Sequence, residues 1–284
     1  MSLTLTALHR FPLKSGRGET LDSAAVQAWG LDGDRRWMVV DAAGEAVTAR
    51  EQRRLLLVHP RIRDDGGLDL TSPDLPDLTV ARPDGTEHAD VSLFHGTPFP
   101  AAVADAEAHA WFSELCGEPV RLVYADDPSS RHASTRLAGP GVPLAFGDGY
   151  PLLVATEESL AALNELVAQG PRADEGPLPM VRFRPNLVVA GDRPWAEDGW
   201  RRLRVGDAVL RAVKGCARCS IPTTDHETGI RYKEPTFTLA QHRRWDGAVW
   251  FAMNLVPETP GAVLRVGDEV ELLETVDHSD GPPR

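Results

Sequence analysis

The residues whose types and spacing could do chemistry are two cysteines, Cys216 and Cys219, in the segment KGCARCSIPTTDHETG. The 284-residue chain holds only three cysteines, too few for a disulfide framework, and a close pair in a reducing compartment is more often catalytic or metal-binding than structural. A thioredoxin-like dithiol would stand at the start of a helix, where the helix dipole lowers the thiol pKa. Pro222 and two threonines follow the pair here, and they make a poor helix start.

Two other interpretations of the pair compete with a dithiol. A zinc site needs about four ligands, and the nearest candidates are Asp225, His226 and His242, without a second Cys-x-x-Cys motif to complete a tetrahedron. Alternatively, both cysteines are small apolar side chains buried at the end of a strand, which is common for free cysteine. These residues alone leave the three interpretations open.

The composition argues against several classes of partner. The chain has 42 acidic and 30 basic residues, a formal net charge of −12 and a pI near 5.2. Nucleic-acid binding relies on a basic surface that releases counterions from phosphates, so we expect no nucleic-acid partner. The start, MSLTLTALHRFPLKS, has no basic segment followed by an apolar run, and no stretch approaches the roughly 18 apolar residues that span a bilayer. We therefore expect a cytoplasmic protein without a membrane partner, and the frequent Arg, Ala and Gly with few Lys suggest a bacterial source.

The elements that must position the cysteine pair are expected to be mostly short strands. A helix is predicted at 105–117, with Asp105 as its N-cap and Gly117 as its end, and Cys116 within it is expected to be a buried apolar side chain. Candidate strands recur in the first third of the chain at the spacing of sandwiches and barrels, in the segments LTLTALHRF, RRWMVVDAAG, EAVTAR, LLLVHPRI, LDLTSP and LTVARPDG.

The region 126–151 is rich in Pro, Ser, Gly and Arg and is predicted to be a long connection between two domains. A strand, LLVAT, follows it, and a second helix is predicted to begin after Thr156 as N-cap. The Gly-Asp turns in RVGDAVLRAV and RVGDEVELLE predict hairpins or bulges. Further strands are predicted in RFRPNLVVAG, RRLRVGDAVLRAV, VWFAMNLV and GAVLRVGDEVELLE.

Several ordered motifs run along nearly the whole chain. The N-terminal ones are FPLKSGRGE, GLDGDRRWMVVD and VTAR, and the C-terminal ones are FRPNLVV, the CARC segment with its following TTD and KEP, and RVGDEVELL. Together they resemble the MOSC family, the molybdenum-cofactor sulfurase C-terminal domain, and in particular two-part members similar to the mitochondrial amidoxime-reducing component and its bacterial relatives. The resemblance implies a mainly β (α+β) fold of two β-barrel-like parts, with a MOSC N-terminal β-barrel domain at 1–125 and a MOSC domain with a few helices at 126–284.

The resemblance also implies that the chain binds the molybdenum cofactor, Mo-molybdopterin. Cys219 is then the metal ligand and a catalytic residue, because a thiolate is a soft donor that a metal already bound by sulfur accepts, while Cys216 packs beside the pocket or lines it. Such a site does not need imidazole, so His226 and His242 are not expected to be ligands. The family's cofactor contacts fall on Lys14, Ser15, Arg35, Gly149, Tyr150, Arg184, Asn186, Ala217, Arg218 and Cys219.

A second catalytic residue is expected in the segment GDGYP, which matches the family loop that closes over the metal. Asp148 in this segment is a candidate proton donor or water-positioning residue. Gly and Tyr follow it where small hydroxyl residues are familiar in the family, so substrate access is expected to differ. Arg50 in VTAR is equally consistent with a structural ion pair, for example with Glu51 or Asp41.

By this resemblance the protein is a molybdenum-dependent oxidoreductase that reduces N-hydroxylated compounds. The sequence shows no further cysteine cluster for a four-cysteine iron–sulfur site, so electrons are expected from a separate flavin, haem or iron–sulfur protein. The alternative is a non-catalytic carrier or sulfur-transfer protein for the cofactor, and a third alternative is a pterin-free dithiol redox protein. A solvent-open pocket beside the metal would favour the enzyme, and a cofactor exposed only at its phosphate would favour the carrier.

Overall fold

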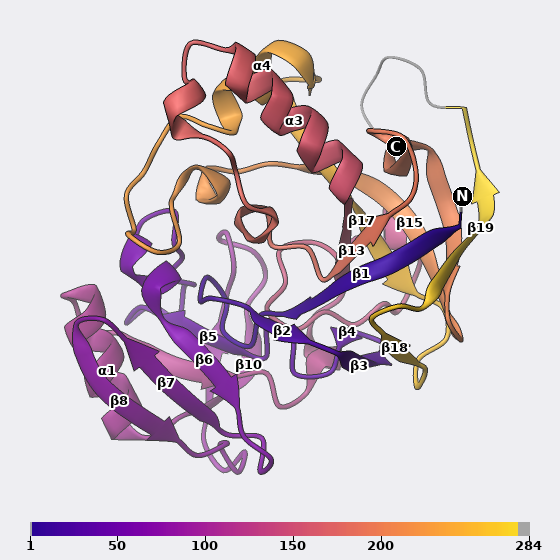
Figure 1. The fold of residues 1–284 in the computed structure, drawn as a ribbon. Coiled ribbons are helices and arrows are strands. Elements are labelled where there is room, and N and C mark those ends of the chain that lie inside the picture. The colour runs from indigo at the N-terminus through magenta and orange to yellow at the C-terminus, as the bar shows by residue number, and fades with distance from the viewer. Residues whose placement is uncertain (1, 278–284) are drawn as a thin grey trace.

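A closed β-barrel is the largest element of the computed structural model, which describes residues 2–277 (Figure 1). In this part of the chain, seven strands form the ring in the order β12-β13-β1-β19-β14-β15-β17, and β17 pairs with β12 to close it. β12 and β13 run parallel, whereas their neighbours in the ring pair antiparallel. The barrel strands are β1 (Leu3–Arg10), β12 (Leu152–Thr156), β13 (Leu187–Ala190), β14 (Trp200–Val205), β15 (Ala208–Ala217), β17 (Ala248–Pro257) and β19 (Glu269–Thr275).

Apolar side chains from the ring strands fill the barrel interior. Leu5, Val154, Leu203, Leu210 and Met253 are all fully buried in one cluster. Each such side chain contributes on the order of 1.5–3 kcal/mol through the apolar surface that it removes from water. The barrel is therefore a packed core, and polar groups that bind ligands must lie at its rim.

Two helices cover one side of the barrel, where they lie above β13 and β17 in Figure 1. The longer one begins as predicted, because the Thr156 hydroxyl accepts a hydrogen bond from the Ser159 backbone amide. Its Leu163 and Val167 pack in a cluster with Phe251 of β17. The α-helices among the described residues are α1 (Ala106–Cys116), α2 (Thr135–Ala138), α3 (Glu157–Gln169) and α4 (Thr236–His242).

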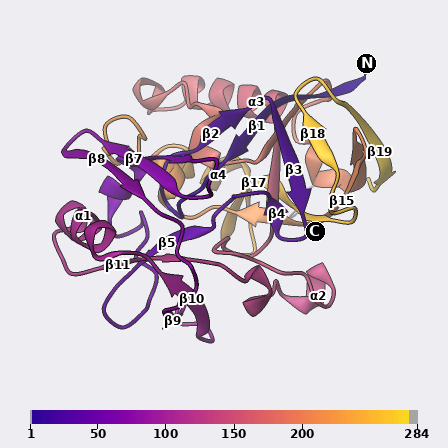
Figure 2. The ribbon, with the colours of Figure 1, turned by 90° about the horizontal axis from the view of Figure 1, so that it is seen from below.

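The remaining strands build smaller sheets, most of them in the N-terminal half, and Figure 2 shows the strands β5, β9, β10 and β11 on the side away from α3. One sheet has the order β5-β11-β10-β9, a second the order β6-β7-β8 and a third the order β18-β3-β4, while β2 pairs with β1 and β16 with β17. These strands are β2 (Glu19–Leu21), β3 (Ser23–Gln27), β4 (Gly30–Leu31), β5 (Trp37–Val40), β6 (His59–Ile62), β7 (Leu68–Ser72), β8 (Leu75–Val80), β9 (His88–Val91), β10 (Phe99–Val103), β11 (Arg121–Tyr124), β16 (Arg244–Trp245) and β18 (Val263–Arg265).

The predicted fold class is confirmed, since the chain is mostly β with a few helices. The predicted helix at 105–117 is also confirmed, because the Asp105 carboxylate accepts from the Ala108 amide and Gly117 ends α1 in the left-handed conformation. Cys116 at the end of α1 is half-buried, and burial raises the pKa of its thiol to about 11.

Some local predictions are wrong, because tertiary pairing overrides the local signal. The first Gly-Asp turn makes the β14–β15 hairpin, with Val205 opposite Ala208. The second does not, since β18 pairs with β3 and β19 pairs with β14 and β1. EAVTAR makes only isolated bridges, and LLLVHPRI enters its strand from a 3-10 helix at Arg53–Leu57.

The predicted domain boundary at residues 125 and 126 stays a prediction. In space, strands from the first part of the chain take part in the sheets of the second part, because β1 lies between β13 and β19 and β3 pairs with β18. Figure 1 shows this exchange as the indigo β1 strand running along the orange and yellow barrel. Within residues 2–277, none of the helices combines the length and the apolar character needed to cross a membrane.

Candidate functional site

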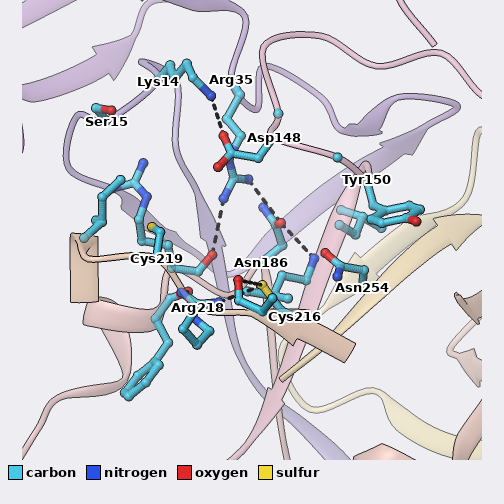
Figure 3. Close-up of a pocket in the computed structure, with 18 of the residues that line it drawn as sticks. Lys14, Ser15, Arg35, Asp148, Tyr150, Asn186, Cys216, Arg218, Cys219 and Asn254 are labelled. Carbon is cyan, nitrogen blue, oxygen red and sulfur yellow. Dashed lines mark hydrogen bonds and ion pairs between the residues drawn. The ribbon is translucent and has the colours of Figure 1, made fainter. Parts of the chain in front are cut away.

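A pocket opens where the end of β15, the loop before β12 and the turn after β1 meet (Figure 3). All residues predicted for the site line this pocket, although their individual roles stay predictions. They come from segments far apart in the sequence. The motifs gave only the order of these residues along the chain, and the fold brings them together in one pocket. These residues are Lys14, Ser15, Arg35, Asp148, Gly149, Tyr150, Arg184, Asn186, Ala217, Arg218 and Cys219.

The cysteine pair lies on the last part of β15 and the turn after it. Cys216 is in the strand, and Cys219 follows two residues after the strand ends at Ala217. Both thiols are free and half-buried, and Cys219 packs against a small apolar cluster that contains Leu56 and Ile221. The next element is a short 3-10 helix, so Cys219 does not start an α-helix as a thioredoxin-like thiol would. Within residues 2–277, no group of three or more His, Cys, Asp and Glu side chains is placed to hold a metal ion.

Lys14 is buried, with only 5% of its side chain exposed. Its ammonium donates to the Phe146 carbonyl oxygen at 2.9 Å and to the Asp148 carboxylate at 2.5 Å. Burial lowers the pKa of Lys14, and the Asp148 charge opposes this effect. The next residue, Ser15, has a φ of 67° and accepts the Ala49 backbone amide on its hydroxyl oxygen at 3.0 Å. These contacts fix the turn as a rigid wall of the pocket.

Asp148 connects two cations across the mouth of the pocket. Its carboxylate accepts from Lys14 and, at 2.8 Å, from the Arg50 guanidinium, although 56% of its side chain is exposed. Burial would raise the pKa of Asp148, but the Lys14 and Arg50 charges hold this pKa well below its usual range. An acid that stays ionised is a poor proton donor. The arrangement therefore favours Asp148 as an acceptor that orients cations or a water, and its catalytic assignment stays a prediction.

Arg50 has a different partner from those expected from the sequence. It pairs with Asp148, whereas Glu51 accepts from the Thr48 hydroxyl and Asp41 accepts backbone amides of its own turn. Burial would lower the pKa of Arg50, but the neighbouring Asp148 and Cys219 side chains raise it. Arg50 is therefore a functional candidate, because it lines the pocket and acts on the predicted metal ligand.

A hydrogen-bonded group of three residues lines the pocket, namely Arg35, Arg184 and Asn186. The Arg35 guanidinium pairs with Asp34 and donates to the Asn186 side-chain oxygen at 3.2 Å and to the Arg184 carbonyl oxygen at 3.3 Å. Both arginines have left-handed backbones, with φ of 50° and 57°, which costs on the order of 1–3 kcal/mol each. Strain of this size persists only where the surrounding contacts fix the conformation.

Arg184 and Asn186 are buried and hydrogen-bonded to the surrounding protein. Arg184 donates to the Gly16 carbonyl oxygen at 2.5 Å, and its guanidinium lies 4.2 Å from the centre of the Phe11 ring. Burial lowers the pKa of Arg184 to about 9. The Asn186 side chain accepts from the Leu153 amide and donates one of its two hydrogens to the His9 carbonyl oxygen. Most of its hydrogen-bonding capacity therefore goes to the protein.

Arg218 connects the cysteine segment to the pocket wall. Its guanidinium donates to the Cys216 sulfur at 3.0 Å and to the Phe183 carbonyl oxygen at 2.8 Å. Its Nε atom is buried and has no hydrogen-bond partner among the described residues. A buried donor without a partner costs about 1–3 kcal/mol, so a ligand with an acceptor group would be stabilised here. The contact also gives Cys216 a function, since it helps to hold Arg218 in place.

The loop at 147–150 is held from behind by Arg131, which donates to the carbonyl oxygens of Ala145, Gly147 and Asp148. Gly149 lines the pocket, and a Cβ atom at this position would meet nothing within 4 Å, so there is open space beside the residue. Tyr150 packs partly against an apolar cluster, and burial raises the pKa of its hydroxyl.

Sequence reasoning missed Asn254, which also lines the pocket. Its side-chain amide donates to the carbonyl oxygens of Lys214 and Gly215, at 3.1 and 3.2 Å, where the β15–β17 register shifts just before Cys216. The available signal was an amide within the apolar run VWFAMNLV. Asn254 thus positions the strand that carries the cysteine pair.

A second cavity, the aromatic groove, continues from the pocket and shares Arg218 and Cys219 with it. It is open to solvent, because Arg231, Lys233 and other residues of its lining are exposed. Other lining residues come from the segment after the cysteine pair and from α4, and they include Tyr232, Thr236, Phe237 and Gln241. Cys219 is therefore reachable from two sides.

The donor set of the pocket fits the molybdenum cofactor. Five cationic side chains line it, whereas Asp148 is the only carboxylate among the described lining residues, although the whole chain has a net charge of −12. This local excess suits the phosphate of a pterin cofactor, and a half-buried thiol suits a soft metal. The cations are Lys14, Arg35, Arg50, Arg184 and Arg218.

The fold and the pocket define a two-part β protein with a cationic site beside a thiol, and the sequence comparisons agree. Residues 2–119 match the family described as MOSC N-terminal beta barrel domain, and residues 142–271 match the MOSC domain. The chain belongs to the MOSC family, which confirms the resemblance seen in its motifs.

Several named proteins are similar to this chain. The chain is 32% identical over 288 residues to the mitochondrial amidoxime-reducing component 1 of Homo sapiens, covering 95% of this chain and 83% of that protein. It is also 32% identical to the molybdenum cofactor sulfurase of Oryza sativa subsp. japonica over 92% of this chain, but it spans only 34% of that protein's length. The crystal structure of the YuaD protein from Bacillus subtilis is 12% identical, with a TM-score of 0.42, over 95% of this chain and 94% of that chain.

Proposed function

We propose that the protein is a molybdenum-cofactor-dependent oxidoreductase that reduces N-hydroxylated compounds in the cytoplasm. The name of the human relative, an amidoxime-reducing component, supports this reaction class. In the overall conversion, an N-hydroxylated compound takes up two electrons and two protons, its N–O bond breaks, and an amine or amidine and water result. The bound cofactor would supply the two-electron chemistry, and a separate flavin, haem or iron–sulfur protein would supply the electrons.

The residues of the pocket would hold and orient the reactants. Cys219 would bind the metal through its thiolate, and the buried Arg184 and half-buried Arg218 would donate to the phosphate and the pterin edge. Lys14 and Arg50 would keep Asp148 ionised at the mouth, where it can accept a hydrogen bond from a water or from the N-hydroxy group. The proton donor is then a solvent water rather than Asp148.

The aromatic groove is the observation that favours an enzyme over a carrier. A carrier needs only to hold the cofactor, whereas an enzyme must also let a second molecule reach the metal. The groove gives such a molecule a route from solvent to Cys219, and of the cations that would bind the cofactor it shares only Arg218 with the pocket.

A carrier or sulfur-transfer role is the second candidate. It is supported by the 32% identity to a molybdenum cofactor sulfurase over 92% of this chain. Because the chain spans only 34% of that relative, the relative's whole activity cannot be transferred to it.

The test uses cofactor-loaded protein, a chemically reduced dye as electron donor and benzamidoxime as acceptor, with benzamidine followed by chromatography. We expect turnover that depends on bound molybdenum and is lost in Cys219→Ser. Loaded protein whose metal the dye reduces, but which converts neither benzamidoxime nor N-hydroxycytosine, would support the carrier instead. A chain that binds no molybdenum under any loading condition would contradict both roles.

A further inference from the structure

The aromatic groove contains two rings that the hydrophobic core does not explain. Tyr232 and Phe237 are half-buried in its lining, and neither belongs to a core cluster of the described residues. A guanidinium lies against each ring, with Arg182 at 5.6 Å from the centre of Tyr232 and Arg172 at 5.3 Å from that of Phe237. Aromatic surface that is held in place outside the core is typical of a ligand site.

The backbone around these rings is fixed. The Tyr232 amide donates to the Thr223 carbonyl oxygen at 2.8 Å, which ties the segment after the cysteine pair to the 3-10 helix beside Cys219. Glu175 accepts the amides of Lys233 and Glu234, both at 2.8 Å. The groove is therefore preorganised, which reduces the entropy cost of binding.

The rim of the groove carries two positively charged side chains that form no ion pair among the described residues. Arg231 and Lys233 are exposed, and within residues 2–277 neither forms an ion pair. The neighbouring carboxylates form ion pairs with other arginines, since Asp225 pairs with Arg182 at 2.7 Å and Glu175, which also accepts the Lys233 backbone amide, pairs with Arg172 at 2.9 Å.

The charge of the groove differs from that of the chain as a whole. With Arg218, three cations and no carboxylate line the groove among the described residues, whereas acidic residues outnumber basic ones 42 to 30 in the sequence. Such a local reversal attracts anions to a surface that leads to Cys219.

We infer that the aromatic groove binds the body of the substrate and selects flat aromatic N-hydroxylated compounds that carry an anionic group. This inference rests on the proposed function and deepens it. The aromatic body lies against Tyr232 and Phe237, the anionic group reaches Arg231 and Lys233, and the N-hydroxy end points to Cys219. The chemistry at the metal is the same for neutral and anionic compounds, so the selectivity acts on binding.

The test compares benzamidoxime with its 4-carboxylate on cofactor-loaded wild type and on the double variant Arg231→Gln/Lys233→Gln. Two exposed ion pairs should lower the KM of the carboxylate by roughly fivefold to tenfold relative to benzamidoxime, and the double variant should abolish this preference. The KM of benzamidoxime, which carries no anionic group, should change far less than the KM of its 4-carboxylate. Phe237→Leu should instead raise the KM of both compounds by roughly threefold to tenfold, because both lose the ring contact.

A matched control separates the groove from general electrostatics. Arg61→Gln/Arg265→Gln removes the same charge from exposed positions on β6 and β18, outside the groove. It should leave the carboxylate preference intact. An equal loss of preference in the control, or an unchanged preference in the groove variant, would overturn the inference.

A binding measurement distinguishes failure of the inference from failure of the proposed function. The dissociation constants of benzamidine and 4-carboxybenzamidine are measured by calorimetry on the same loaded proteins, without turnover. If neither N-hydroxy compound is reduced but the carboxylate still binds more tightly to wild type than to the groove variant, the groove assignment holds and the reaction is wrong. If reduction occurs and the carboxylate has no advantage in either measurement, the reaction holds and the anion selectivity is wrong.

Discussion

Replacing Asp148 by Asn tests the electrostatic account of the pocket mouth most directly. The substitution keeps the shape of the side chain but removes the negative charge that faces Lys14 and Arg50. Lys14 is only 5% exposed, so its ammonium would remain nearly buried with a carbonyl oxygen and an amide as partners. The folded state should therefore lose stability even without any effect on catalysis.

The size of this loss of stability depends on how much of the Lys14 and Asp148 side chains is exposed to solvent. Removing one partner of a fully buried ion pair costs about 3–5 kcal/mol, whereas a fully exposed pair is worth about 0–1 kcal/mol. Because 56% of the Asp148 side chain is exposed, solvent screens much of the interaction, and we expect a loss of about 1–2 kcal/mol. For a chain of this size the melting temperature should fall by roughly 2–6 °C.

The pH dependence carries a definite sign. The folded pKa of Asp148 is lowered, so the wild-type advantage is fully present above the unfolded pKa of about 4 and is lost as the pH falls toward the folded value. Wild type and Asp148→Asn are compared by thermal unfolding at equal cofactor content. The difference between their melting temperatures should be largest near neutral pH and should become smaller in acid. Asp69→Asn, which removes a half-exposed partner of Arg63, should change stability by no more than about 0.5 kcal/mol.

A double variant completes the test. Lys14→Met/Asp148→Asn removes the cation together with its partner, so it should be more stable than Asp148→Asn alone. Equal melting temperatures for wild type and Asp148→Asn near neutral pH would refute the reasoning. If the difference in melting temperature between the two proteins stays the same in acid, the loss of stability does not come from the charge of the carboxylate.

Three further predictions concern the cofactor and the core. Cys219→Ser should lose bound molybdenum by mass spectrometry, whereas Cys216→Ser should keep most of it; equal metal content in wild type and Cys219→Ser would contradict the ligand assignment. Arg218→Ala should weaken cofactor retention by about tenfold or more, since a charge-assisted hydrogen bond is worth about 1.5–3 kcal/mol; unchanged retention in dialysis would count against it. Burial, and secondarily Asp198, raises the pKa of Glu197 from 4.5 to about 7, so the folded state should lose stability as pH rises through this window. Glu197→Gln should remove that part of the pH dependence, and identical pH profiles of the melting temperature would refute it.

The sequence predicted features that depend on local signals. The N-cap of α3, the N-cap and end of α1 and the β14–β15 hairpin follow from residues within a few positions of each other. The family motifs also selected residues that line one pocket, because each carries a residue type suited to a phosphate, a pterin or a soft metal, and the roles of these residues stay predictions.

The features that the sequence did not predict depend on contacts between residues far apart along the chain. Arg50 pairs with Asp148, which lies almost a hundred residues away in the sequence. No local pattern shows that Asp148 is its partner rather than the nearer Glu51. The same holds for β18 and β19, whose connecting turn has the sequence of a hairpin although the barrel offers each strand another partner. The ionised state of Asp148 depends on two cations that only the fold brings within hydrogen-bonding distance.

The position of β1 in the barrel has a consequence for how the chain folds. Leu3 pairs with Val270, so the ring between β13 and β19 closes only when strands from both extremes of the described chain meet. Closing so long a loop carries a high entropy cost and makes folding slow. During synthesis, β1 must wait until β19 has left the ribosome before the two strands can pair. A fragment that begins at residue 126 would leave the edges of β13 and β19 unpaired, and open edges of this kind promote aggregation.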